Sequence, residues 1–155
     1  MFELPLDAWY VWIGLAVVSS TVLGVVGALP SALPPDASGA AGAIDSVAAS
    51  DHAAIEEHPL SNTDSVRLGA DSVSLRGPGG TRTEALGYGP VTPVRGGSVL
   101  EPVLRGESPD LVFDSPTTFQ RAIVRAQRAE PHWEGTERLV VRRVSWGEID
   151  AVLVG

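Results

Sequence analysis

The histidines are the side chains of this sequence best suited to chemistry near neutral pH, and two of the three lie close together. His52 and Glu56 are four positions apart, so a helix would bring them onto one face, and His58 follows at once. Two imidazoles and a carboxylate form a ligand set that zinc accepts. The surrounding sequence shows no residues that would orient these ligands. The pattern therefore favours solvated surface side chains over a metal site, and we predict no cofactor.

Motifs that would indicate catalysis are missing from the sequence. The run Gly77-Pro78-Gly79-Gly80 is not followed by Gly-Lys-Ser/Thr, so it predicts a hairpin turn and not a phosphate-binding loop. No Gly-x-Ser-x-Gly motif of a serine hydrolase occurs. Asp110 and Asp114 flank Phe113, but helix capping explains Asp114 better than a paired-carboxylate active site does. We predict no catalytic residues and no enzyme activity.

Arginines are concentrated on one predicted helix of the C-terminal half. Arg121, Arg125 and Arg128 are spaced i, i+4 and i+7, so they share the face opposite the apolar one. They are candidate contacts for an acidic protein partner, for anionic lipid headgroups or for the acidic segment 36–57. The plainer interpretation is a solvated helix face with local ion pairs. Nucleic acid is not an expected partner, because the chain is acidic and has no base-stacking module.

Composition constrains the chemistry and the environment of the chain. With 155 residues there is room for one small domain, and the lack of cysteine excludes disulfides and thiolate metal sites. All eleven basic residues are arginine and the formal net charge is −8. Eight acids and no basic residue fall in residues 1–66, whereas residues 67–155 are neutral overall. An acidic, lysine-free composition suits a medium of high salt, in which charges are strongly screened.

The longest apolar stretch of the sequence lies near its N-terminus. No charged residue occurs between Asp7 and Asp36, and a helix from Ala8 to Leu29 would be roughly 33 Å long, enough to cross a bilayer. We therefore expect residues 1–30 to be a membrane anchor. Small residues recur every fourth position, a spacing that favours packing of helices in lipid. They are Ala16, Ser20, Gly24 and Ala28.

The fate and direction of this anchor are less constrained by the sequence. Small residues near Gly27-Ala28 leave cleavage as a secretory signal open, although the segment is longer than usual and lacks a basic start. Neither flank carries lysine or arginine, so the positive-inside rule does not decide the orientation. The short leader and the single apolar segment favour a single-pass protein in the cell membrane with its C-terminal domain outside.

The rest of the chain divides by composition into two parts. Residues 31–64 are rich in Ala, Pro, Ser and acids, and we expect a stalk or a short helix there. Residues 65–155 show alternating apolar residues that predict a strand around Val73 and a return strand after the turn at 77–80. Residues 91–94 predict an edge strand or an extended loop, and residues 99–104 predict an edge strand.

The last third of the sequence predicts a helix followed by a hairpin. Ser115 and Pro116 form a helix start, and Phe119 and Ile123 begin its apolar face. Residues 139–145 and 149–154 predict the two strands of the hairpin. We expect an α+β fold in which a transmembrane helix precedes a small antiparallel β-meander packed on one helix, similar in plan to a pilin.

Four stretches of the sequence resemble an uncharacterised family of short membrane-anchored proteins from halophilic archaea. They are DAWYVWIGLA (7–16), DSVSLRGPGGT (71–81), GYGPVTPV (87–94) and RLVVRRVSWGEIDAVLVG (138–155). The resemblance implies no catalytic residues, and it suggests an association with type IV pilus-like assemblies. The prolines at 30, 34 and 35 and the missing basic leader differ from a pilin.

These observations lead to one functional hypothesis and one alternative. We expect a non-catalytic structural or partner-binding subunit of a cell-envelope or pilus-like assembly, in contact with the bilayer and with a membrane-protein partner or a second copy of itself. The alternative is a membrane-tethered enzyme or a metal- or solute-binding domain that uses His52, Glu56 and His58.

Overall fold

The computed structural model describes residues 12–18 and 32–155, and the chain divides between Ser31 and Ala32 into two units. In the first unit, residues 12–18 form an exposed helix. Within the described residues, no helix is both long enough and apolar enough to cross a membrane. The expected span from Ala8 to Leu29 lies mostly outside the described residues, and so do Ser20, Gly24 and Ala28 of its small-residue stripe.

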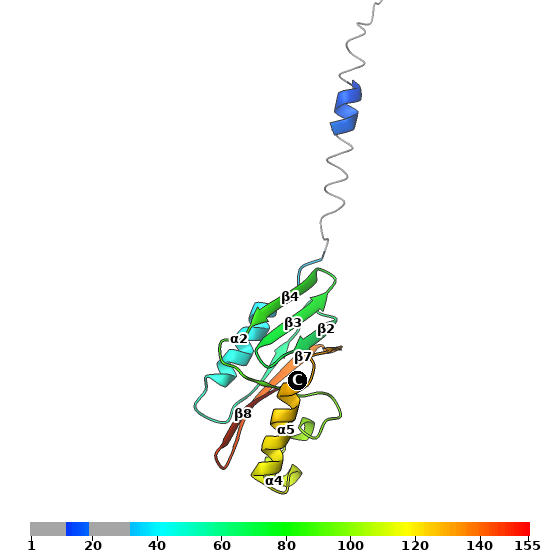
Figure 1. Ribbon diagram of the computed structural model, residues 1–155. Coiled ribbons are helices and arrows are strands. Elements are labelled where there is room, and N and C mark those ends of the chain that lie inside the picture. The colour runs from blue at the N-terminus through cyan, green and yellow to red at the C-terminus, as the bar shows by residue number, and fades with distance from the viewer. Residues whose placement is uncertain (1–11, 19–31) are drawn as a thin grey trace, which may run out of the picture. The chain divides into compact units, whose positions relative to one another are not determined.

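Two four-stranded sheets form the framework of the second unit (Figure 1). The first sheet has the order β1-β7-β8-β5; its β5 runs parallel to β8, and its other pairs are antiparallel. The second sheet has the order β4-β3-β2-β6 and is antiparallel throughout. The strands are β1 (Ile55–Pro59), β2 (Ser65–Leu68), β3 (Ser72–Gly77), β4 (Gly80–Ala85), β5 (Thr92–Pro93), β6 (Trp133–Glu134), β7 (Arg138–Trp146) and β8 (Ile149–Val154).

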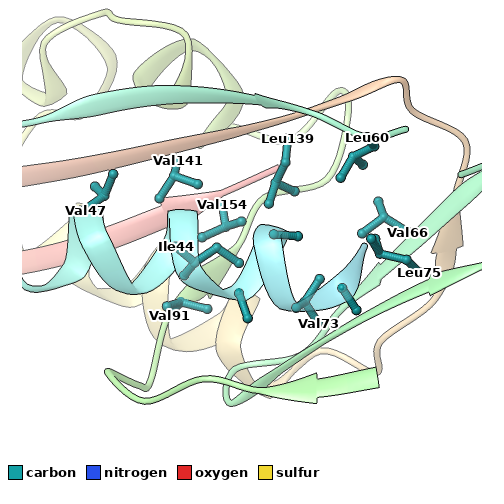
Figure 2. Close-up of a cluster of buried hydrophobic side chains, with 13 residues drawn as sticks. Ile44, Val47, Leu60, Val66, Val73, Leu75, Val91, Leu139, Val141 and Val154 are labelled. Carbon is teal, nitrogen blue, oxygen red and sulfur yellow. The ribbon is translucent and has the colours of Figure 1, made fainter. Parts of the chain in front are cut away.

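Helix α2 (Ala37–Ala48) packs against both sheets. It begins where the Asp36 carboxylate accepts a hydrogen bond from the backbone N–H of Gly39 at 2.9 Å, which satisfies a free donor of the first turn. The helix buries Ala40 and Ile44 completely. Around them gather valines and leucines from both sheets, among them Val73 and Val141 (Figure 2). The alanines allow the strands to approach the helix closely on either side.

The opposite face of the first sheet is covered by three helices, α3 (Glu101–Leu104), α4 (Pro109–Val112) and α5 (Pro116–Arg128). Strand β7 serves both faces because its side chains alternate, with Val141 in the cluster around α2 and Val144 in the cluster under α5. Phe119 of α5 is fully buried, and its ring centroid lies 5.2 Å from that of Phe113. The two clusters therefore lie on opposite faces of the first sheet, and side chains of this sheet contribute to both.

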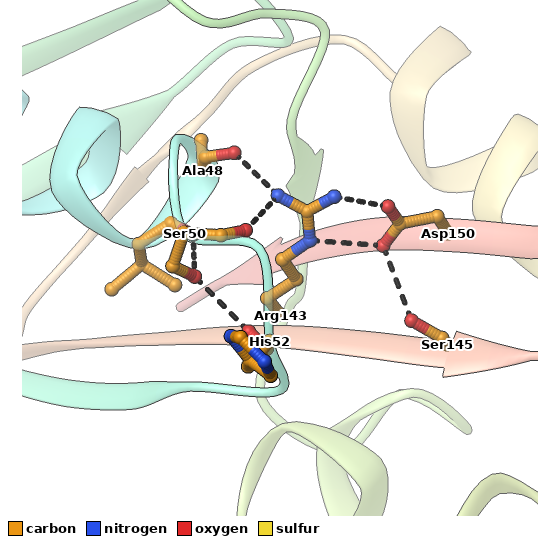
Figure 3. A network of polar contacts seen from close by, with 7 residues as sticks. Ala48, Ser50, His52, Arg143, Ser145 and Asp150 are labelled. Carbon is orange, nitrogen blue, oxygen red and sulfur yellow. Dashed lines mark hydrogen bonds and ion pairs between the residues drawn. The ribbon is translucent and has the colours of Figure 1, made fainter.

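Arg143 of β7 connects the first sheet to the end of α2 (Figure 3). Its guanidinium donates hydrogen bonds to the carbonyl oxygens of Ala48, at 2.7 Å, and Ser50, and to both carboxylate oxygens of Asp150. The hydrogen bonds to Asp150 raise the pKa of Arg143 above its ordinary value, so the side chain stays charged. A cation at these carbonyls also complements the negative end of the helix dipole.

Several expectations about local structure are confirmed. The helix at 115–129 forms as α5, where Ser115 and Thr118 make a capping box and Pro116 occupies the first turn. The hairpin around the turn at 77–80 forms as β3 and β4, and the C-terminal hairpin forms as β7 and β8.

The expected fold class is wrong in its architecture, although the α+β class itself holds. The second unit contains two sheets and four helices, not one meander on a single helix. The described part of the chain contains no helix that could be the expected transmembrane one. Residues 99–104 are not a strand: Pro102 lies in the first turn of α3, where a proline needs no N–H partner. Residues 31–64 were expected to form a stalk or a short helix, and the helix forms as α2. This helix lies in the core, and the following strand β1 pairs along its full length with β7.

Candidate functional site

A cavity of about 260 Å³ opens between β2, the C-terminal half of α5 and the loop at 94–100. Val66 and Leu68 of β2 line one wall of this space. Ala122 and Ala126 line the opposite wall, and their small side chains leave the volume unfilled. The floor of the cavity is therefore apolar.

A second hollow of about 490 Å³ continues from the first toward β7. The two share five lining residues, which makes them one continuous depression that we call the β2 groove. The shared residues are Val66, Leu68, Val94, Arg95 and Glu134. The groove thus runs from α5 along the inward side of β2 and β6.

Charged side chains surround the apolar floor of the β2 groove. Arg95 donates a hydrogen bond of 2.6 Å to the backbone carbonyl of Glu130, which ties the loop after β5 to the end of α5. His132 Nε2 and Glu134 Oε1 lie 2.7 Å apart, with both side chains more than a third exposed. Arg125 completes the rim on the α5 side. An apolar floor with charged groups at the edge is typical of sites that bind amphiphilic groups.

Ser98 supplies an unusual polar atom in the wall of the groove. Its Oγ is the one buried side-chain nitrogen or oxygen without a hydrogen-bond partner within residues 12–18 and 32–155. A buried hydroxyl that makes no hydrogen bond costs about 1–3 kcal/mol. A ligand or peptide group in the groove could accept or donate the missing hydrogen bond.

The three arginines that the sequence grouped together lie on one helix, and one of them lines the groove. Arg121, Arg125 and Arg128 are all exposed on α5, but of these only Arg125 lines the groove. Among the described residues, no ion pair within 4 Å involves any of the three. Arg125 and Arg128 also lie in the last turn of α5, where they complement the helix dipole. Ala16, the one member of the small-residue stripe within the described residues, belongs to the first unit.

The three residues considered for metal binding, His52, Glu56 and His58, do not lie on a helix. Glu56 and His58 lie on β1, and His52 lies in the bend before it, where its carbonyl accepts a hydrogen bond from Ser50 Oγ. In the part of the chain that the structure describes, no group of three His, Cys, Asp or Glu side chains is placed to hold a metal ion. The helical spacing that suggested the site fails because the segment is extended.

Sequence reasoning missed Arg95, Ser98 and the His132–Glu134 pair. These residues come from a loop and from the two-residue strand β6, neither of which has a periodic pattern. It also missed Trp133 of β6, whose ring centroid lies 4.0 Å and 4.9 Å from the guanidinium carbons of Arg76 and Arg67, so that cation–π contacts add to the backbone pairing of β6 with β2. The sequence signal would have been the single arginine on each of β2 and β3, which shares one face with serines while valine and leucine occupy the other.

We compared the chain with protein-family models, with curated proteins and with solved structures. No curated protein and no solved structure matches the chain. A family model, described as a family of unknown function (DUF7283), matches residues 3–144. That match covers most of the sequence, and the chain therefore belongs to this family.

Proposed function

We propose that this protein is a non-catalytic, partner-binding subunit of a cell-envelope assembly, and that its partner docks in the β2 groove. The observation that carries the proposal is the combination of an apolar floor, a buried Ser98 hydroxyl without a partner and a rim of charged side chains. An apolar floor with a charged rim suits a peptide segment that is apolar at its centre and charged at its edge. The segment would insert an apolar side chain and offer a hydrogen-bonding group to Ser98.

The charges on the rim favour a partner segment that carries carboxylates on the α5 side. Arg125 is exposed there and makes no ion pair within 4 Å in the described residues, and Arg121 and Arg128 extend the positive surface along the helix. Arg95 is held in place by its hydrogen bond to Glu130. A carboxylate beside Arg125 would gain a charge-assisted hydrogen bond. We therefore name an acidic-apolar protein segment as the occupant.

The setting of this interaction is part of the same proposal. The uncharged sequence between Asp7 and Asp36 supports attachment to the cell membrane. The short leader and the single apolar segment support a C-terminal domain outside the cell. The acidic, lysine-free composition supports a halophilic source, and the resemblance of the four sequence stretches supports a pilus-like assembly as the setting. The rival metal-binding role rests on His52, Glu56 and His58, and no described contact favours it over the groove.

Photocrosslinking in intact membranes tests the proposal. A photoreactive residue at Val99, an exposed groove-lining position, should yield one protein adduct of defined mass. The matched probe at Leu111, an exposed apolar residue of α4 away from the groove, should not. Arg125→Glu should abolish the Val99 adduct, whereas Arg128→Glu on the same helix should leave most of it. Adducts to lipid alone, or equal adducts from both probes, would overturn the proposal.

A further inference from the structure

Strand β4 is an outer strand of the second sheet with an uncovered side (Figure 1). It pairs with β3 on one side, and each of its six residues is exposed. A strand at a sheet edge presents unpaired backbone groups that can hydrogen-bond another strand. β4 also lacks the proline that would block such pairing, since its sequence is GTRTEA.

The register of the hairpin tells which backbone groups of β4 point outward. Gly77 and Gly80 close a two-residue turn, so they form a hydrogen-bonded pair, and every second residue of β4 then bonds toward β3. The N–H and C=O groups of Thr81, Thr83 and Ala85 consequently point away from β3. The carbonyl of Thr81 accepts a 3.1 Å hydrogen bond from Arg82 Nη1, as expected for an edge carbonyl outside the ladder.

The sequence of β4 is complementary to itself when two copies run antiparallel. If Thr83 faces Thr83 of a second copy, Thr81 faces Ala85, and about six outward hydrogen bonds form. The same register places Arg82 opposite Glu84 twice, in pairs that are not hydrogen-bonded and whose side chains are closest. Opposite charges therefore meet at both ends of the contact.

The other long edge strand lacks this property. β1 contains Glu56 and Glu57 and ends in Pro59. The even-numbered residues of this segment bond toward β7, so the open edge of β1 is formed by Ile55, Glu57 and Pro59. An antiparallel pair of β1 strands centred on Glu57 would set Glu57 against its own copy, which is unfavourable. Self-pairing is thus favoured at β4 and disfavoured at β1.

The surroundings of β4 leave room for a second copy. Ser38 of α2 donates a hydrogen bond to Glu84 at 3.2 Å, so this side of the helix lies beside the strand. The exposed side of α2 carries small residues, and a side chain added at Gly42 would meet no atom within 4 Å. No bulky side chain of α2 blocks the approach of a second helix.

We propose that two copies of this chain associate through their β4 strands, antiparallel and centred on Thr83, to form one continuous eight-stranded sheet. The second copy pairs Arg82 with Glu84 across the two-fold axis. This inference goes beyond the proposed partner site, because it uses the opposite strand of the second sheet and none of the groove residues.

Single cysteines test the register, since the natural chain has none. In the full chain reconstituted in lipid vesicles, Thr83→Cys places two thiols on α-carbons about 5.5 Å apart, within the range of a disulfide. The matched variant Thr81→Cys places them about 14 Å apart, which is out of reach. Diamide, which takes up the two electrons and two protons, should crosslink Thr83→Cys and not Thr81→Cys on a non-reducing gel.

Exchanging the charges at positions 82 and 84 distinguishes the loss of the proposed contact from a folding defect. In the Thr83→Cys background, Arg82→Glu should reduce the rate of crosslinking about tenfold, because it places Glu opposite Glu84. The double variant Arg82→Glu/Glu84→Arg should restore the rate, since the pair is only exchanged. Equal crosslinking of the two cysteine variants, or no rescue by the double variant, would overturn the proposal. Neither result depends on the Val99 adduct that tests the groove.

Discussion

Arg143 and Asp150 lie on neighbouring strands of the first sheet, and the guanidinium of Arg143 donates hydrogen bonds to both carboxylate oxygens of Asp150. The same guanidinium binds the carbonyl oxygens of Ala48 and Ser50 at the end of α2. Asp150 thereby orients the cation that caps the helix, and the sheet and α2 are joined by one side chain.

Removing this side chain should weaken the attachment of α2. We expect Arg143→Met to lower the thermal midpoint by several degrees, because two carbonyls and a carboxylate lose a charged donor at once. Arg143→Lys should recover part of the loss, since an ammonium cannot serve all four acceptors in the planar arrangement of a guanidinium. Thermal unfolding followed by circular dichroism measures both. A midpoint unchanged in Arg143→Met would contradict the role of this residue.

Ile44 tests whether α2 belongs to the folded core. The side chain is fully buried between strands of both sheets, so Ile44→Ala should lower the free energy of unfolding by about 3 kcal/mol. Ser46→Ala, at an exposed position of the same helix, should change it by less than about 0.5 kcal/mol. Chemical denaturation of both variants measures the difference. Equal small effects would mean that α2 is a detached segment after all.

That segment also shows the limit of sequence reasoning. A short helix was one of two expectations for residues 31–64, but the apolar stripe of an alanine-rich helix is thin, and nothing local indicates that two sheets close on it. Pro102 was equally ambiguous, because its fixed φ fits both an edge strand and the first turn of a helix. In contrast, the capping signal Ser115-Pro116 and the glycine turn at 77–80 act within a few residues, and both were interpreted correctly.

The candidate site was the least predictable part. Arg125 was recognised from its helical spacing, but the groove beside it joins β2, β6, the loop at 94–100 and α5. These segments are far apart in the sequence and meet only through tertiary packing. No pattern in any one of them could indicate that Ser98 and Val66 would line the same cavity.

Two serines allow the groove to be examined through stability. Ser74 Oγ is 2.9 Å from Thr83 Oγ1, whereas Ser98 Oγ has no partner within the described residues. Ser74→Ala should therefore cost about 1 kcal/mol, and Ser98→Ala should be neutral or stabilising by up to about 1 kcal/mol. Denaturant titration of the two variants gives the signs. A comparable loss in both would show that Ser98 does have a hydrogen-bond partner in solution.

The distribution of charge predicts how stability depends on salt. Residues 32–155 contain seventeen acids and eleven arginines, so the second unit carries an excess of negative charge. Most of these acids make no ion pair within 4 Å, since the described residues form four ion pairs, one of which involves histidine. Raising the salt concentration from about 0.1 M to 1 M shortens the Debye length from about 10 Å to 3 Å and weakens the repulsion.

We expect the thermal midpoint to rise steadily with KCl over this range, and to rise less in a variant with Glu56 and Glu57 both changed to Gln. A midpoint that falls with added KCl would show instead that the ion pairs, such as Arg138 with Glu57 at 3.1 Å, outweigh the repulsion.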